Sequence, residues 1–291
     1  MNFLDKLVIP QSAEHIQLLH YLLMLILFLF IPFISIVFGA TLLSLYYKIK
    51  GLSESNVLYI RFSKDVIETL TINKSVGIIL GIIPIITAML IYIQLLQGTN
   101  ANISLYMIFS LFCVSIGLIL IYTYRYSMSF MEIYDSVKNF KPEDEEVEHK
   151  ISKFRKANLS LSGKSVKWGI FFLFIGIWLF ISSVTVAVYP EMWGRYNIFY
   201  LMFSWEVLSK LFGFLSAAMA LTGASIFFAF FYWEGGMHMH SDQYRDFVRK
   251  IAAGITFTGT ILMPLFMVID LFAAPSDALS GSVFFFLTVA L

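Results

Sequence analysis

Residues 198–233 read IFYLMFSWEVLSKLFGFLSAAMALTGASIFFAFFYW, and this stretch decides the fold class. A run of about 20 apolar residues is long enough to cross the hydrocarbon core of a bilayer as a helix. The stretch therefore predicts a membrane span. It also contains an acid and a base one helical turn apart, Glu206 and Lys210. Because charges inside a span are costly, they mark a candidate functional site.

The composition extends this prediction to the whole chain. Of its 291 residues, 59% are hydrophobic and 13% are charged, whereas a soluble domain carries about 25% charged residues. We therefore expect an all-α, polytopic bundle of transmembrane helices in a lipid membrane. The net charge of +1 provides no basic excess for nucleic acid, so no nucleic-acid partner is expected. The single cysteine excludes an internal disulfide and a cysteine cluster for a metal.

Apolar runs predict six full spans and a partial seventh. The full spans cover residues 17–46, 75–97, 104–124, 167–190, 198–233 and 250–274, and the partial span covers residues 281–291. This divides the chain into residues 1–124 with three spans, a loop at 125–166, and residues 167–291 with the remaining spans. Residues 52–72 have the pattern of an amphipathic helix that lies on the inner interface.

Loop charges predict the orientation of the chain. Lysine and arginine residues gather in the loops after the first, third and fifth spans, whereas the alternate side carries only Lys6 and Arg195. Because cytoplasmic loops are enriched in basic residues, we expect the N-terminus outside and the loop at 125–166 in the cytoplasm. That loop is expected to form a solvated hairpin or a surface helix, or alternatively a docking site for a soluble partner.

Two groups of residues resemble those of a known family. The second span opens with Asn73, Gly77 and Gly81 at four-residue spacing. The sixth span carries a further set: Phe247, Arg249, Lys250, Ala252, Gly259, Pro264, Leu265 and Asp270. Together with the order of the spans, these residues resemble the N-terminal half of cytochrome bd quinol oxidase subunit I, which implies the cytoplasmic (inner) membrane of a bacterium or archaeon. Gly77 and Gly81 have a second interpretation, as a small-residue pair that lets two helices pack closely.

The resemblance also implies haem b and quinone as cofactors, and cytochrome subunits of a respiratory complex as partners. For the haem ligand of the first span, Leu27 stands at the matching position, and His20 is the candidate metal ligand if the alignment contains an insertion. In the fifth span, Trp205 stands where the family has a haem-ligating histidine, and tryptophan cannot ligate iron. The resemblance therefore implies a divergent subunit. It either binds quinol or haem near the outer face, or has a haem-free structural role beside cytochrome subunits.

Three charged residues of the outer membrane layer form the candidate catalytic site. Glu206 and Lys210 have the spacing of an ion pair within one helix, and Asp270 ends the sixth span at the same depth. One interpretation is a self-neutralising pair in which Lys210 reaches toward the interface. The other is a proton or quinol-headgroup site, with Glu206 as proton acceptor and Lys210 holding its charge.

The remaining motif and the two functional hypotheses complete the expectations. Residues 237–240 read Met-His-Met-His, a pattern that predicts either a copper site or a solvated turn. The first functional hypothesis is a membrane subunit of an electron-transfer complex, as part of a quinol-oxidising oxidoreductase. The second is a proton-coupled transporter or a purely structural membrane scaffold, for which the three charged residues would line a path.

Overall fold

The computed structural model describes residues 12–71, 73–97, 99, 101, 103–137, 145–194, 197–233, 241–274 and 281. This part of the chain consists of helices and short connections, without a strand. It contains six helical segments that are long and apolar enough to cross a membrane. The predicted all-α bundle with six spans is thereby confirmed. The predicted partial span at 281–291, apart from Gly281, and the motif at 237–240 lie outside the described residues.

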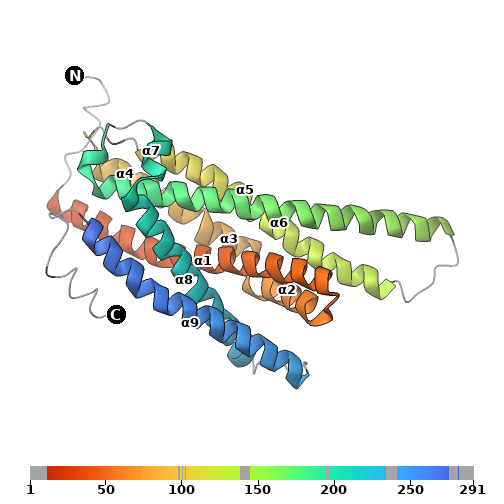
Figure 1. Cartoon of the computed structure of the whole chain (residues 1–291). Coiled ribbons are helices and arrows are strands. Elements are labelled where there is room, and N and C mark those ends of the chain that lie inside the picture. Colours follow the sequence, from red (N-terminus) through yellow and green to blue (C-terminus); the bar gives the residue numbers. More distant parts are fainter. Residues whose placement is uncertain are drawn as a thin grey trace.

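The helices are named in chain order. They are α1 (Ala13–Glu54), α2 (Val57–Leu70), α3 (Lys74–Gly81), α4 (Ile83–Leu95), α5 (Ile103–Val137), α6 (Glu145–Val188), α7 (Ile198–Met202), α8 (Trp205–Phe227) and α9 (Asp242–Ala273). A 3-10 turn, η2 (Pro190–Met192), follows α6, and a π-helical turn, η3 (Phe228–Tyr232), follows α8. Figure 1 shows them as an elongated bundle in which the long helices run roughly along one direction.

The first two helices fold back on each other. α1 has 42 residues, about 63 Å at 1.5 Å per residue, which exceeds the thickness of a bilayer core. Ser55 ends it in the left-handed region (φ 52°), and α2 then returns along α1. The Ser44 hydroxyl on α1 donates to the carbonyl of Ser63 on α2 at 2.7 Å. The buried residues of α2 recur at helical spacing: Phe62, Ser63, Val66, Ile67 and Leu70. A helix is therefore present within the segment 52–72, over Val57–Leu70, and its buried face packs on α1, whereas its position at the inner interface stays a prediction.

The second span is built from α3 and α4, and its glycines permit close packing. A Cβ at Gly77 would collide with the Tyr122 hydroxyl of α5, and a Cβ at Gly81 would lie 2.7 Å from Leu118 Cδ1. Small residues at such positions let membrane helices approach each other. The interpretation of Gly77 and Gly81 as a helix-packing pair is therefore confirmed.

α5 and α6 form the longest helix pair of the bundle. They lie side by side, and at one end they extend past α1, α2 and α9 (Figure 1). Much of the segment 125–166, which was predicted as a loop, is helical, because α5 continues to Val137 and α6 begins at Glu145. The Ser127 hydroxyl lies 2.6 Å from the Asn158 side-chain oxygen and ties the two extensions together. The described part of this segment therefore consists of extensions of the two spans.

The fifth span begins later than the apolar run suggested. α7 ends at Met202, and α8 starts at Trp205 after Ser204, whose hydroxyl accepts the backbone N–H of Val207 at 3.4 Å. A serine that caps a helix satisfies a backbone donor that has no partner within the helix. The prediction of one unbroken span over 198–233 is therefore wrong. Glu206 lies in the first turn of α8, not several residues into a span.

α8 and α9 cross at a contact made of small residues. A Cβ at Gly259 of α9 would lie 2.7 Å from the carbonyl oxygen of Ser216, and one at Gly223 of α8 would lie 2.8 Å from that of Ala252. α9 packs mainly along α8. Near its start, the Tyr244 hydroxyl of α9 also donates to Asp65 of α2 at 2.6 Å. α9 therefore lies at the side of the bundle, held close to α8 along one face.

Candidate functional site

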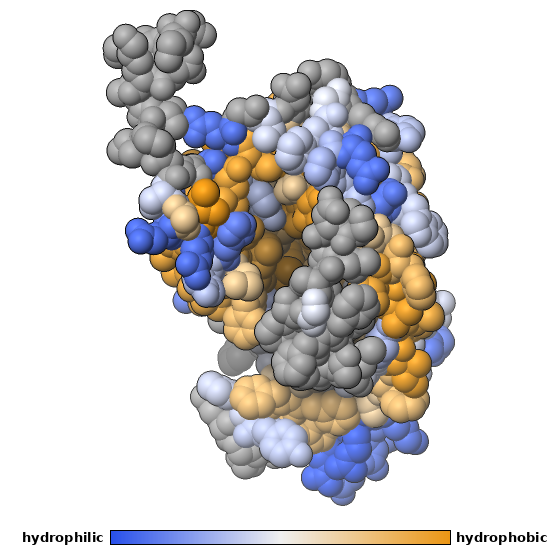
Figure 2. All heavy atoms as spheres, turned by 90° about the vertical axis from the view of Figure 1, so that its left-hand side faces the viewer, coloured by the Kyte–Doolittle hydropathy of each residue, from blue (hydrophilic) through white to orange (hydrophobic). Residues whose placement is uncertain are grey.

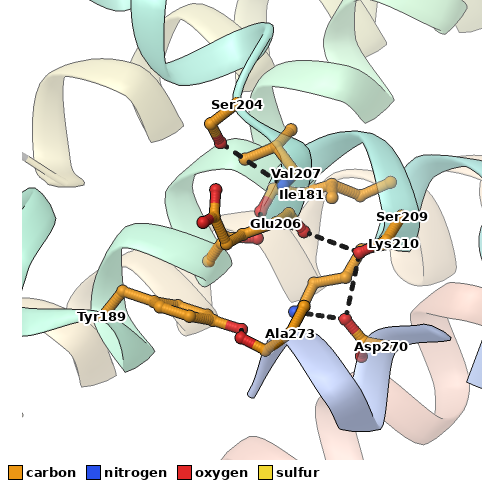
Figure 3. A network of polar contacts seen from close by, with 10 residues as sticks. Ile181, Tyr189, Ser204, Glu206, Val207, Ser209, Lys210, Asp270 and Ala273 are labelled. Carbon is orange, nitrogen blue, oxygen red and sulfur yellow. Dashed lines mark hydrogen bonds and ion pairs between the residues drawn. The ribbon is translucent and has the colours of Figure 1, made fainter. Parts of the chain in front are cut away.

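The charged residues of α8 and α9 meet at one end of the bundle. α8 starts near the end of the bundle where α9 ends, so Lys210, in the second turn of α8, faces Asp270, three residues before Ala273, the last residue of α9. The Lys210 Nζ atom lies 2.6 Å from Asp270 Oδ1 (Figure 3). The Ser209 hydroxyl donates to the same oxygen at 3.2 Å. Hydrogen bonds between charged groups are short and strong, so this contact joins the two helices at their ends.

The predicted ion pair between Glu206 and Lys210 is wrong. Within the described residues Lys210 pairs with Asp270, and Glu206 forms no ion pair. Figure 3 shows the Glu206 carboxylate directed away from Asp270. Two physical causes explain the difference. α9 brings a carboxylate of another helix within reach of the lysine, and the positive N-terminal end of the α8 dipole stabilises a carboxylate in the first turn without a basic partner.

Tyr189 is a site residue that was not among the predicted site residues. Its hydroxyl donates to the backbone oxygen of Ala273 at 2.9 Å, which ties the end of α9 to the end of α6. The Lys210 Nζ atom lies 5.1 Å from the centre of the Tyr189 ring, within the range of a cation–π contact. The sequence spacing of Tyr189 and Ser209 did not indicate that they contact the end of α9, because these contacts depend on how α6, α8 and α9 pack.

The ion pair borders a cavity inside the bundle. The cavity has a volume of about 390 Å³ and lies between α1, α6, α8 and α9. Its polar lining residues are Ser209, Lys210 and Asp270, and the others are apolar, among them Phe30, Ile34, Phe180, Phe214 and Met267. Figure 2 views the end of the bundle where α1 begins and α9 ends, and shows a hydrophobic hollow between the helices. An apolar cavity with a few convergent polar groups is typical of a small-molecule site.

The two candidate haem-binding residues, His20 and Trp205, lie outside this cavity, whereas Leu27, which stands at the position of the family's first-span ligand, lines it. His20 is exposed on α1, and Trp205, at the first position of α8, is 62% exposed. Neither residue lines the cavity. Among the described residues, no group of three histidine, cysteine, aspartate or glutamate side chains could hold a metal ion. His20 and Trp205 are therefore not enclosed by the described part of this chain.

The geometry brings together two of the five predicted site residues. Lys210 and Asp270 form the polar end of the cavity, Glu206 lies nearby without joining the pair, and His20 and Trp205 are exposed elsewhere. The resemblance to cytochrome bd subunit I stays a prediction. Comparisons of the chain with protein-family models, with curated proteins and with solved structures find no match.

Proposed function

We propose that this chain is an integral membrane subunit of a respiratory electron-transfer complex and that it binds quinol at the Lys210–Asp270 end of the cavity. One observation carries the proposal: an apolar cavity of about 390 Å³ ends at a hydrogen-bonding ion pair. A quinol combines an aromatic ring with hydroxyl groups, so its ring suits the apolar lining and its hydroxyls suit the polar end.

The polar groups have complementary hydrogen-bonding roles toward a quinol. The Lys210 ammonium is a donor only, the Asp270 carboxylate is an acceptor only, and the Ser209 hydroxyl is both. A hydroxyl of the ligand can therefore accept from Lys210 and donate to Asp270. Glu206 lies one turn before Lys210 and is half-buried, so it is the proposed acceptor of a released proton. The enzyme activity is thus assigned only to the complex, with the electrons passing to a cytochrome partner.

The haem and the orientation are parts of the same proposal. Because His20 and Trp205 are exposed, we assign the haem b groups to cytochrome subunits and a haem-free role to this chain. The positive-inside distribution supports an external N-terminus in the cytoplasmic membrane of a bacterium or archaeon. In that orientation the ion pair lies toward the outer face.

An absorption spectrum with a pyridine haemochrome assay tests this assignment directly. The purified chain is expected to show no haem bands, whereas the complex isolated from native membranes is expected to contain cytochrome. Quinol binding is measured on the same preparation with a short-chain quinol analogue. The Asp270→Asn variant is compared with the control variant Tyr232→Phe, which changes an exposed residue. A chain that neither binds the analogue nor isolates with a cytochrome would refute the proposal.

A proton-coupled transporter is the second candidate, because the ion pair joins two different helices beside a cavity. Ion pairs between helices can break and re-form during alternating access. Replacing Glu206 by glutamine separates the candidates. Loss of quinol oxidation with intact assembly supports the redox subunit, whereas loss of proton-coupled uptake supports the transporter. No change in either measurement, with normal assembly, leaves the purely structural scaffold.

A further inference from the structure

We propose that the cavity is entered sideways from the bilayer and that it selects single-chain amphiphiles with an uncharged, hydrogen-bonding head. This inference deepens the proposed function, since it concerns the same site. It rests on the charge balance at the polar end, on the cavity volume, and on the packing of α9.

The charge balance determines which heads are accepted. Lys210 and Asp270 neutralise each other, and the Ser209 hydroxyl also points to this pair. An anionic head would lie beside the Asp270 carboxylate, and a cationic head would lie beside the Lys210 ammonium. In an apolar cavity such like-charge contacts are weakly screened. An alcohol or phenol can accept from the lysine and donate to the aspartate without disturbing the pair.

The volume sets how much of the ligand is enclosed. About 390 Å³ lies near the lower end of the roughly 300–1,000 Å³ that is typical of ligand pockets. That space holds a head and the first part of a chain, but not a complete lipid. The remainder of a long tail must leave the cavity through one of its walls.

Among the described residues, the α9 side of the cavity is the less covered one. α9 packs mainly on α8, and its lining residues Met263, Phe266 and Met267 are only half-buried. Ile31, which lines the cavity from α1, is 38% exposed. A tail that leaves between α1 and α9 therefore enters the hydrocarbon region, and the same route admits the ligand.

Gly213 provides a way to fill the cavity without disturbing the helix packing. It lines the cavity from α8. A Cβ at this position would meet only Phe266 Cβ, at 3.7 Å, which is ordinary van der Waals contact. A leucine at this position can therefore occupy the space of the ligand.

The experiment compares three probes with identical tails: dodecanol, dodecanoate and dodecylammonium. The full-length protein is placed in nanodiscs of zwitterionic lipid, and a photoreactive dodecanol labels it. The labelled residues are located by mass spectrometry. Each unlabelled probe competes at a known mole fraction in the bilayer, so that differences in partitioning cancel. We expect labelling on α1 and α9, and at least tenfold stronger competition by dodecanol than by either charged probe.

Charge variants test whether the ion pair causes this preference. Asp270→Asn leaves a positive site and is expected to improve dodecanoate competition at least tenfold, whereas Lys210→Met is expected to do the same for dodecylammonium. Gly213→Leu is expected to abolish labelling with an unchanged melting temperature. Equal competition by the three probes in the wild-type protein would overturn the proposal, and this measurement requires no variant to fold. Labelling that persists in Gly213→Leu, or an unchanged preference in both charge variants, would also overturn it.

The outcomes separate this inference from the proposed function. Selective dodecanol competition without binding of a quinol analogue would refute the quinol assignment and support the selection of uncharged heads. Binding of a quinol analogue with equal competition by all three probes would refute the selectivity and support the quinol assignment.

Discussion

Breaking the Lys210–Asp270 contact should destabilise the bundle more than removing Glu206. The side chains of the pair are 24% and 37% exposed, so the pair is neither fully buried nor fully solvated. Breaking a buried pair by removing one partner costs about 3–5 kcal/mol, whereas an exposed pair contributes about 0–1 kcal/mol. For this intermediate exposure we expect Asp270→Asn to lower the free energy of unfolding by about 1–2 kcal/mol.

The assay is a double-mutant cycle measured by unfolding in mixed micelles. Lys210→Met, Asp270→Asn and the double variant are titrated with a denaturing detergent, and the coupling energy is the deviation from additivity. We expect a coupling of about 1 kcal/mol between Lys210 and Asp270. Glu206→Gln is the matched control and should change stability by less than about 0.5 kcal/mol, because it forms no ion pair in the described part of the chain. A second cycle combines Lys210→Met with Glu206→Gln, and a stronger coupling in that cycle than between Lys210 and Asp270 would refute the structural assignment.

Two further predictions concern how α9 is held. Gly259→Ala places a Cβ against the α8 backbone and should lower the free energy of unfolding by about 1–3 kcal/mol through overpacking. Gly254→Ala, with open space around it, should leave the stability unchanged or raise it slightly. Unfolding in detergent compares the two variants, and equal effects would contradict the close crossing of α8 and α9. Tyr244→Phe removes the hydrogen bond to Asp65 and should lower stability by about 1–3 kcal/mol. The same change at the exposed Tyr232 is the control, and hydrogen exchange near the start of α9 should rise only in the Tyr244 variant.

The sequence was sufficient to predict the number and type of the spans, because hydropathy and length alone decide whether a helix can cross a bilayer. It was insufficient for the start of the fifth span, because Ser204 lies within a continuous apolar run and its capping role depends on local backbone geometry. The helical spacing of Glu206 and Lys210 suggested a pair within one helix. The observed partner, Asp270, is 60 residues away in sequence, so its selection required the packing of α8 against α9.

The position of the ion pair argues for a role beyond stability. Replacing a buried ion pair by well-packed apolar residues is often neutral or stabilising, so such a pair is weak evidence that it exists to hold the fold. Here α9 is also held by the small-residue contact at Gly259, by the hydrogen bond from Tyr244 to Asp65 and by the hydrogen bond from Tyr189 to the Ala273 backbone. The pair also borders an otherwise apolar cavity, where an apolar substitute would fill the wall at least as well. This position beside the cavity supports the proposal that the pair forms hydrogen bonds to a small molecule.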